Sequence, residues 1–150
     1  MPSLIYRSAY VLPLTLAFAL LPAPARATEG EVHASMQCDR ASEPGRVRCS
    51  VDVRLEGGRT IAWADVEILA LPEFASALKG RIGPQDALSR DATSTKWALG
   101  LVARRAGAGE ARARVRVVAC DPARPGAPAN EPRTRCTPLL VEVKASLQVG

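Results

Sequence analysis

The stretch Arg46–Glu56 constrains the fold of this chain more than any other, because its apolar and polar residues alternate one by one. Valine, cysteine and leucine occupy every second position, and arginine, serine and acidic residues occupy the positions between. A period of two places the two sets on opposite faces of a β-strand, one buried and one in solvent. The stretch therefore predicts a half-buried strand, and Gly57-Gly58 after it predicts a hairpin-type turn.

Similar patterns recur at short intervals along the chain. Further strands are expected at Val32–Cys38, Thr60–Leu71, Lys96–Arg105, Ala111–Cys120 and Cys136–Val149. Within the second of these the apolar phase changes, which predicts a β-bulge near Ala64-Asp65. Turns are expected at Glu43-Pro44-Gly45 and at Gly107-Ala108-Gly109.

The region around residues 72–95 is the least strand-like part of the chain. It is expected to hold one short helix or an irregular insertion. Pro72 suits the first position of a helix and Gly80 suits the position after its end.

Six or seven short strands separated by turn residues predict an all-β fold, an antiparallel immunoglobulin-like β-sandwich. The spacing of Cys49, Trp63 and Cys120 is similar to the Cys…Trp…Cys pattern of true immunoglobulin domains. That pattern would place a disulfide between Cys49 and Cys120, through the core.

The N-terminus has the features of a cleaved signal peptide covering residues 1–27. Arg7 precedes the apolar run Val11–Leu21, and Ala25-Arg26-Ala27 is a small-x-small cleavage site. Residues 28–150 are then expected to form a single domain, with no further stretch able to span a membrane. The even number of cysteines, together with the overall composition, favours a periplasmic or secreted protein from a bacterial source.

Cleavage would remove two basic residues and leave 18 basic against 15 acidic ones, a net charge of +3. This mild balance argues against a nucleic-acid partner. Arg112, Arg114 and Arg116 form a basic stripe on one strand face. The stripe either attracts an anionic surface or is a solvated face neutralised by acidic residues on neighbouring strands, and the second interpretation is preferred.

Strand parity indicates how the four cysteines pair, because a disulfide between adjacent antiparallel strands joins side chains on the same face. Cys38 and Cys49 share the apolar phase of their strands, whereas Cys120 and Cys136 share the outward phase of theirs. The parity predicts Cys38–Cys49 and Cys120–Cys136. A bridge from Cys49 to Cys120 stays open, since one bulge would turn Cys120 inward.

Few other residues are suited to chemistry. The single histidine, His33, lies near Met36 and Cys38, which together offer soft ligands for copper. On a strand, however, His33 and Met36 face opposite ways, so no metal site and no cofactor are predicted.

The segment from VVACD to RCTPLLVEV resembles the end of the N-terminal periplasmic domain of bacterial thiol–disulfide interchange reductases. The resemblance implies an immunoglobulin-like sandwich in which Cys120 and Cys136 are redox-active, with Pro138 near the family's proline. Fifteen residues separate the two cysteines here, more than in that family.

Two functions follow as hypotheses. The preferred one is an exported, non-enzymatic binding or scaffolding module with two disulfides, whose partner is an unidentified protein or an anionic surface. The alternative is a thiol–disulfide exchange module that uses an accessible Cys120–Cys136 pair, since both cysteines are expected to face outward beside the Pro-rich loop.

Overall fold

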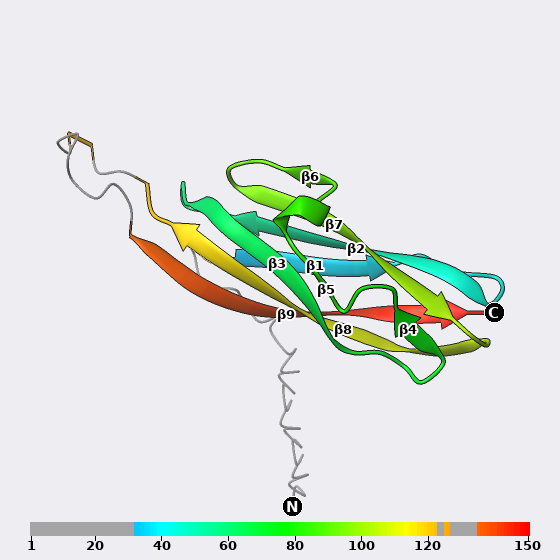
Figure 1. Ribbon diagram of the computed structural model, residues 1–150. Helices are drawn as coiled ribbons and strands as arrows, with labels where there is room; N and C mark the ends of the chain where they lie inside the picture. Colours follow the sequence, from blue (N-terminus) through cyan, green and yellow to red (C-terminus); the bar gives the residue numbers. More distant parts are fainter. Residues whose placement is uncertain (1–31, 123–124, 127–134) are drawn as a thin grey trace, which may run out of the picture.

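The chain is a sandwich of two antiparallel sheets in a computed structural model that describes residues 32–122, 125–126 and 135–150 (Figure 1). The expected signal peptide and most of the Pro-rich loop after Cys120 lie outside the described residues. One sheet has the order β1-β2-β7-β4, with β6 also paired to β7, and the other has the order β5-β3-β8-β9. The elements are β1 (Val32–Cys38), β2 (Gly45–Leu55), β3 (Thr60–Ala70), β4 (Ala75–Ala77), β5 (Arg81–Ile82), the 3-10 turn η1 (Pro84–Asp86), β6 (Ser89–Arg90), β7 (Ser94–Ala103), β8 (Gly107–Cys120) and β9 (Cys136–Val149).

This strand order is that of an immunoglobulin-like sandwich, as the sequence predicts. Constant-type immunoglobulin domains place strands A, B, E and D in one sheet and C, F and G in the other. Here β1, β2, β7 and β4 occupy the places of A, B, E and D, while β3, β8 and β9 occupy those of C, F and G.

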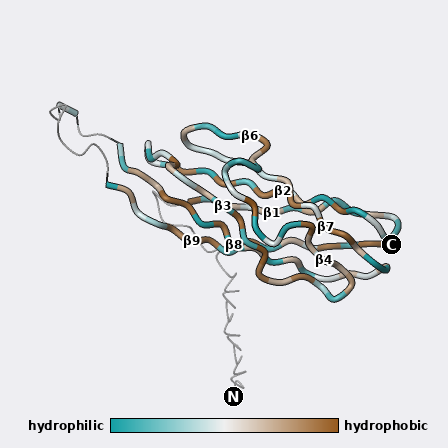
Figure 2. Tube along the Cα trace, in the orientation of Figure 1, coloured by the Kyte–Doolittle hydropathy of each residue, from teal (hydrophilic) through white to brown (hydrophobic). Residues whose placement is uncertain are grey.

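The core forms because inward positions alternate with outward ones on every long strand. On β8 the inward residues from Ala111 to Ala119 are alanine and valine at most 1% exposed, and arginines stand between several of them. Brown and teal segments alternate in the same way along both sheets (Figure 2). From the other sheet Trp97 is fully buried, and its indole N–H donates to the Gly83 carbonyl at 2.9 Å.

The prediction of a short helix after Pro72 is wrong, whereas the alternative prediction of an irregular insertion is confirmed. The amide of Ala75 donates to the carbonyl of Pro72 at 2.9 Å, which closes a turn, and β4 then pairs with the edge of β7. An isolated helix of seven residues is unstable in water, whereas an open strand edge offers immediate backbone partners. The insertion therefore covers the β7 edge with β4 and β6.

Two smaller expectations also need correction. The pairing of β3 with β8 is irregular between Ile61 and Trp63 and again between Ile68 and Ala70, not at Ala64-Asp65. The first of these bulges turns the Trp63 side chain outward. Gly107 starts strand β8 instead of making a turn. A Cβ on Gly107 would come within 2.7 Å of the Phe74 ring, so this glycine permits close packing of the insertion against β8.

The two tryptophans should differ sharply in their contribution to stability. Trp97→Ala removes a buried side chain and its hydrogen bond, and we expect it to cost about 3–5 kcal/mol of unfolding free energy. Trp63, 39% exposed, should cost only about 1 kcal/mol when changed to Ala. Denaturant unfolding of both variants tests this, and equal losses would contradict the placement of Trp97 in the core.

Candidate functional site

The two disulfides each staple a pair of adjacent antiparallel strands. Cys38 lies directly opposite Cys49 across β1 and β2, and Cys120 lies directly opposite Cys136 across β8 and β9. This is the pairing that strand parity predicts. The open alternative, Cys49 to Cys120 through the core, is not formed, although these cysteines do sit on the B-like and F-like strands.

The Cys120–Cys136 disulfide closes the end of the sandwich opposite the C-terminus (Figure 1). Cys120 is only 5% exposed, whereas Cys136 is exposed. The difference arises because β8 is flanked by Thr60 on β3 and by β9, while β9 lies at the edge of its sheet. The expectation that both cysteines are accessible is thus correct for Cys136 alone.

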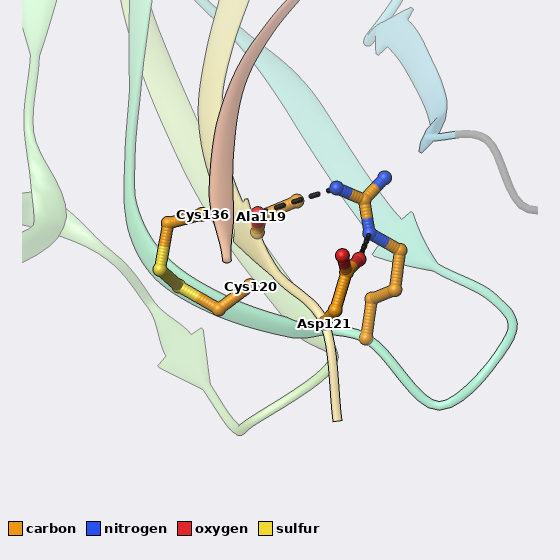
Figure 3. The surroundings of a disulfide bond; sticks show 5 residues. Ala119, Cys120, Asp121 and Cys136 are labelled. Atoms are coloured by element: carbon orange, nitrogen blue, oxygen red, sulfur yellow. Dashed lines mark hydrogen bonds and ion pairs between the residues drawn. A yellow bond between two sulfur atoms is a disulfide. The ribbon is translucent and has the colours of Figure 1, made fainter. Parts of the chain in front are cut away.

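Arg59 fixes the backbone next to this disulfide (Figure 3). Its guanidinium donates to the carbonyl of Ala119 at 3.2 Å and lies 3.0 Å from a carboxylate oxygen of Asp121. The amide of Asp121 in turn donates to the carbonyl of Arg135 at 3.0 Å, which extends the pairing beyond the disulfide. The end of the hairpin is consequently held by covalent, ionic and backbone contacts.

Apolar side chains gather on the outer face of the β5-β3-β8-β9 sheet, next to the disulfide. In one cross-strand row Trp63 lies opposite Val118, which lies opposite Pro138. Leu140, 67% exposed, follows on β9 in the next row. We name these four residues the apolar strip. It crosses three hydrogen-bonded strands, so the backbone fixes the relative positions of its members.

A buried carboxylate, that of Asp65, holds an arginine that in turn fixes Trp63, a member of the apolar strip. Asp65 is 2% exposed and accepts hydrogen bonds from Nε of Arg81 and Nε of Arg116, both at 2.7 Å. The hydrogen bond to Asp65 raises the pKa of Arg116 above its ordinary value. The same guanidinium lies over the Trp63 ring, 5.3 Å from its centroid, in a cation–π contact. Trp63 therefore has a fixed orientation although it is partly exposed.

The basic stripe is ion-paired along its length. Arg112 and Arg114 each donate to Glu142 at 3.2 Å, and Arg116 pairs with Asp65. The hydrogen bond from Arg114, followed by that from Arg112, lowers the pKa of Glu142. The structure thus places a carboxylate against each guanidinium of the stripe.

The soft-ligand candidates do not come together. His33 is exposed and 3.4 Å from Glu56, Met36 is buried, and Cys38 is held in its disulfide. Among residues 32–122, 125–126 and 135–150 no group of three His, Cys, Asp or Glu side chains is arranged to hold a metal ion. The same residues contain no helix long and apolar enough to cross a membrane.

The fold and this site define a small, doubly stapled immunoglobulin-like β-sandwich. No family model and no curated protein matches the chain. It is similar to a PapD-like (ASH) domain of human CEP192, PapD-like domain 7, with 10% identity, a TM-score of 0.40 and coverage of 92% of this chain and 98% of that one. It is also similar to BslA, a bacterial hydrophobin, with 12% identity, a TM-score of 0.34 and coverage of 83% and 97%.

Sequence patterns alone do not disclose the apolar strip. Pro138 and Leu140 share the outward phase of Cys136, which is visible in the sequence. Trp63 joins them only because the bulge in β3 reverses its direction, and Val118 joins them only through the register of β8. The strip is a product of long-range pairing.

Removal of the buried carboxylate should destabilise the fold. Asp65→Ala leaves the guanidiniums of Arg81 and Arg116 without their common acceptor, and we expect a loss of about 1.5–3 kcal/mol of unfolding free energy. Glu142→Ala is the matched control, since it also removes a carboxylate bound by two arginines but at an exposed position. Thermal or denaturant unfolding should show a much smaller loss for the control, and equal losses would refute the anchoring role of Asp65.

Proposed function

We propose that this protein is an exported, non-enzymatic binding module that docks a protein partner on the apolar strip. The observation that carries the proposal is the exposure of Trp63 and Leu140 on one rigid sheet face beside the Cys120–Cys136 staple. Exposed apolar side chains on a fixed surface lose contact with water when a partner covers them, which favours association. Two disulfides support export to an oxidising compartment.

The surroundings of the strip fit a protein partner better than a small molecule. The strip extends across three strands of one sheet, beyond the hollow of about 340 Å³ that Trp63 helps to line, and the ion pairs of Asp65 and Glu142 border it on one side. Protein interfaces commonly combine an apolar centre with a polar rim, and tryptophan and arginine are enriched among their strongest contacts. A standard interface covers about 800 Å² on each partner, so the docked protein would extend from the strip over the charged rows.

Site-specific photocrosslinking in the native cells tests the proposal. A photoreactive residue at position 140 should capture a second protein, whereas one at Leu88, an exposed leucine outside the strip that is bonded to the β7 edge through its amide, should not. The captured protein, once purified, should bind the wild-type chain and lose at least about tenfold in affinity against Leu140→Asp.

Leu88→Asp supplies the matched control in the binding measurement, because it adds the same charge at another exposed leucine. Its affinity should stay within about twofold of the wild type. Adducts that form equally at positions 88 and 140 would contradict the proposal. A crosslinked homodimer as the sole product would also contradict it, because the strip would then serve self-association.

A second candidate function, thiol–disulfide exchange, is favoured by the unequal exposure of the two cysteines. An external thiolate can reach the Cys136 sulfur more readily than the sulfur of Cys120. Attack there would break the Cys120–Cys136 bond, form a mixed disulfide on Cys136 and release Cys120 as a thiolate. A second thiol would resolve the mixed disulfide, so two thiols are oxidised for each disulfide reduced.

Redox titration in glutathione buffers separates the two functions. A reduction potential of about −200 mV for the Cys120–Cys136 disulfide would support exchange, and one below about −300 mV would mark a structural staple. For an exchange module, Cys120→Ser should trap mixed disulfides on the exposed Cys136, and Cys136→Ser should trap far fewer on the buried Cys120. Equal trapping by both variants would contradict directed attack at Cys136.

A further inference from the structure

The β1-β2-β7-β4 sheet, which lies across the core from the apolar strip, carries a hollow of about 550 Å³ beside the turn between β1 and β2. Three arginines line it: Arg40 from the turn, and Arg46 and Arg48 from the outward phase of β2. Leu78, 58% exposed, and Gly100 line it as well. The volume lies within the range of small-ligand sites, about 300–1,000 Å³.

None of these three guanidiniums has an ion pair or hydrogen bond among the described residues. This contrasts with the basic stripe on the other sheet, where every arginine has a carboxylate partner. Asp39 and Glu43 also line the hollow, yet neither makes an ion pair with an arginine there. The hollow therefore holds three positive and two negative side chains, with the positive ones uncompensated by direct contact.

Hydrogen bonds hold the backbone around the hollow, so the Cα positions from which the three arginines extend are set before any ligand arrives. The amide of Asp39 donates to the carbonyl of Arg48 at 2.9 Å. Ala41 donates to Gln148 at 3.1 Å and accepts from Gly150 at 2.8 Å, which attaches the turn to the end of β9. The Cys38–Cys49 disulfide lies next to the hollow on the same two strands. A held backbone reduces the ordering that binding must impose.

We propose that this hollow binds the phosphate group of a phosphorylated ligand. Guanidinium groups form paired, charge-assisted hydrogen bonds with phosphate oxygens. A phosphate monoester carries a charge of about −1.5 to −2, enough to offset the local excess of arginine. Leu78 and Pro44 at the hollow supply apolar contact for the organic part of the ligand. The site lies on the other sheet from the apolar strip and is independent of the function proposed for it.

Titration of the exported protein with inorganic phosphate, followed by backbone amide NMR, tests the site. We expect saturable shifts concentrated in residues 39–48 and weaker binding at higher salt. Arg46→Gln with Arg48→Gln should weaken binding at least fivefold. Arg112→Gln with Arg114→Gln is the matched control, because it removes the same charge from arginines that are already ion-paired, and it should change binding less than twofold.

Glu43→Gln gives an effect of opposite sign. It removes a negative charge from the hollow, so phosphate should bind more tightly than to the wild type. The Arg46/Arg48 variant should keep the wild-type melting temperature, since neither side chain has a partner to lose. Amide shifts spread evenly over the protein, or equal losses in the two double variants, would overturn the proposal.

Vesicles identify the source of the phosphate. Sedimentation with phosphatidylglycerol vesicles, but not with phosphatidylcholine vesicles, that is lost in the Arg46/Arg48 variant would support a lipid headgroup. Phosphate binding without sedimentation would support a soluble phosphorylated ligand. Sedimentation that survives in the Arg46/Arg48 variant, together with no amide shift at residues 39–48, would refute the site.

Discussion

The alternation of small inward residues and charged outward residues along β8 is the constraint on which the rest of the structure depends. Its inward alanines and valines form the centre of the core, and its outward positions carry Arg112, Arg114, Arg116 and Cys120. Because the period is two, the register that buries the valines also sends Cys120 outward. A disulfide through the core is then impossible without a bulge in β8, and the cysteine pairs with Cys136 on the adjacent strand. The buried core face of β8 and the pairing of Cys120 with Cys136 thus both follow from the alternation along this strand.

The same alternation explains how much of the fold is predictable from the sequence. The strong period-two stretches correctly predict β2, β7 and β9 with their inward faces, and strand parity correctly predicts both disulfides. The region after Pro72 was ambiguous because it lacks this period. Its structure depends on the edge of β7, which follows it in the chain and is invisible to a local pattern. The position of the first β3 bulge is not predictable from the sequence for a related reason. Pairing with β8 decides which residue of β3 has no partner across the sheet.

The candidate site was less predictable than the fold, because its members lie far apart in the chain. Asp65 is separated by 51 residues from Arg116, and no local pattern shows that this buried carboxylate joins two guanidiniums. The sequence likewise marks arginines on β8 and on β2 as equivalent outward charges. Only the structure shows that Glu142 and Asp65 pair with the first set, while Arg46 and Arg48 of β2 make no ion pair with the described residues.

This division of charge gives the two outer faces different capacities for binding. On the β5-β3-β8-β9 sheet the charges already satisfy one another, so an incoming partner gains little from them and the apolar strip supplies the attraction. In the hollow on the β2 side the described residues form no ion pair that an anion would have to displace, so charge supplies the attraction at the proposed phosphate site and apolar contact is secondary. Because the faces belong to different sheets on opposite sides of the core, occupation of one leaves the other open. The two proposed sites, one for a protein partner and one for a phosphorylated ligand, therefore lie on opposite sides of the disulfide-stapled core and do not compete for the same surface.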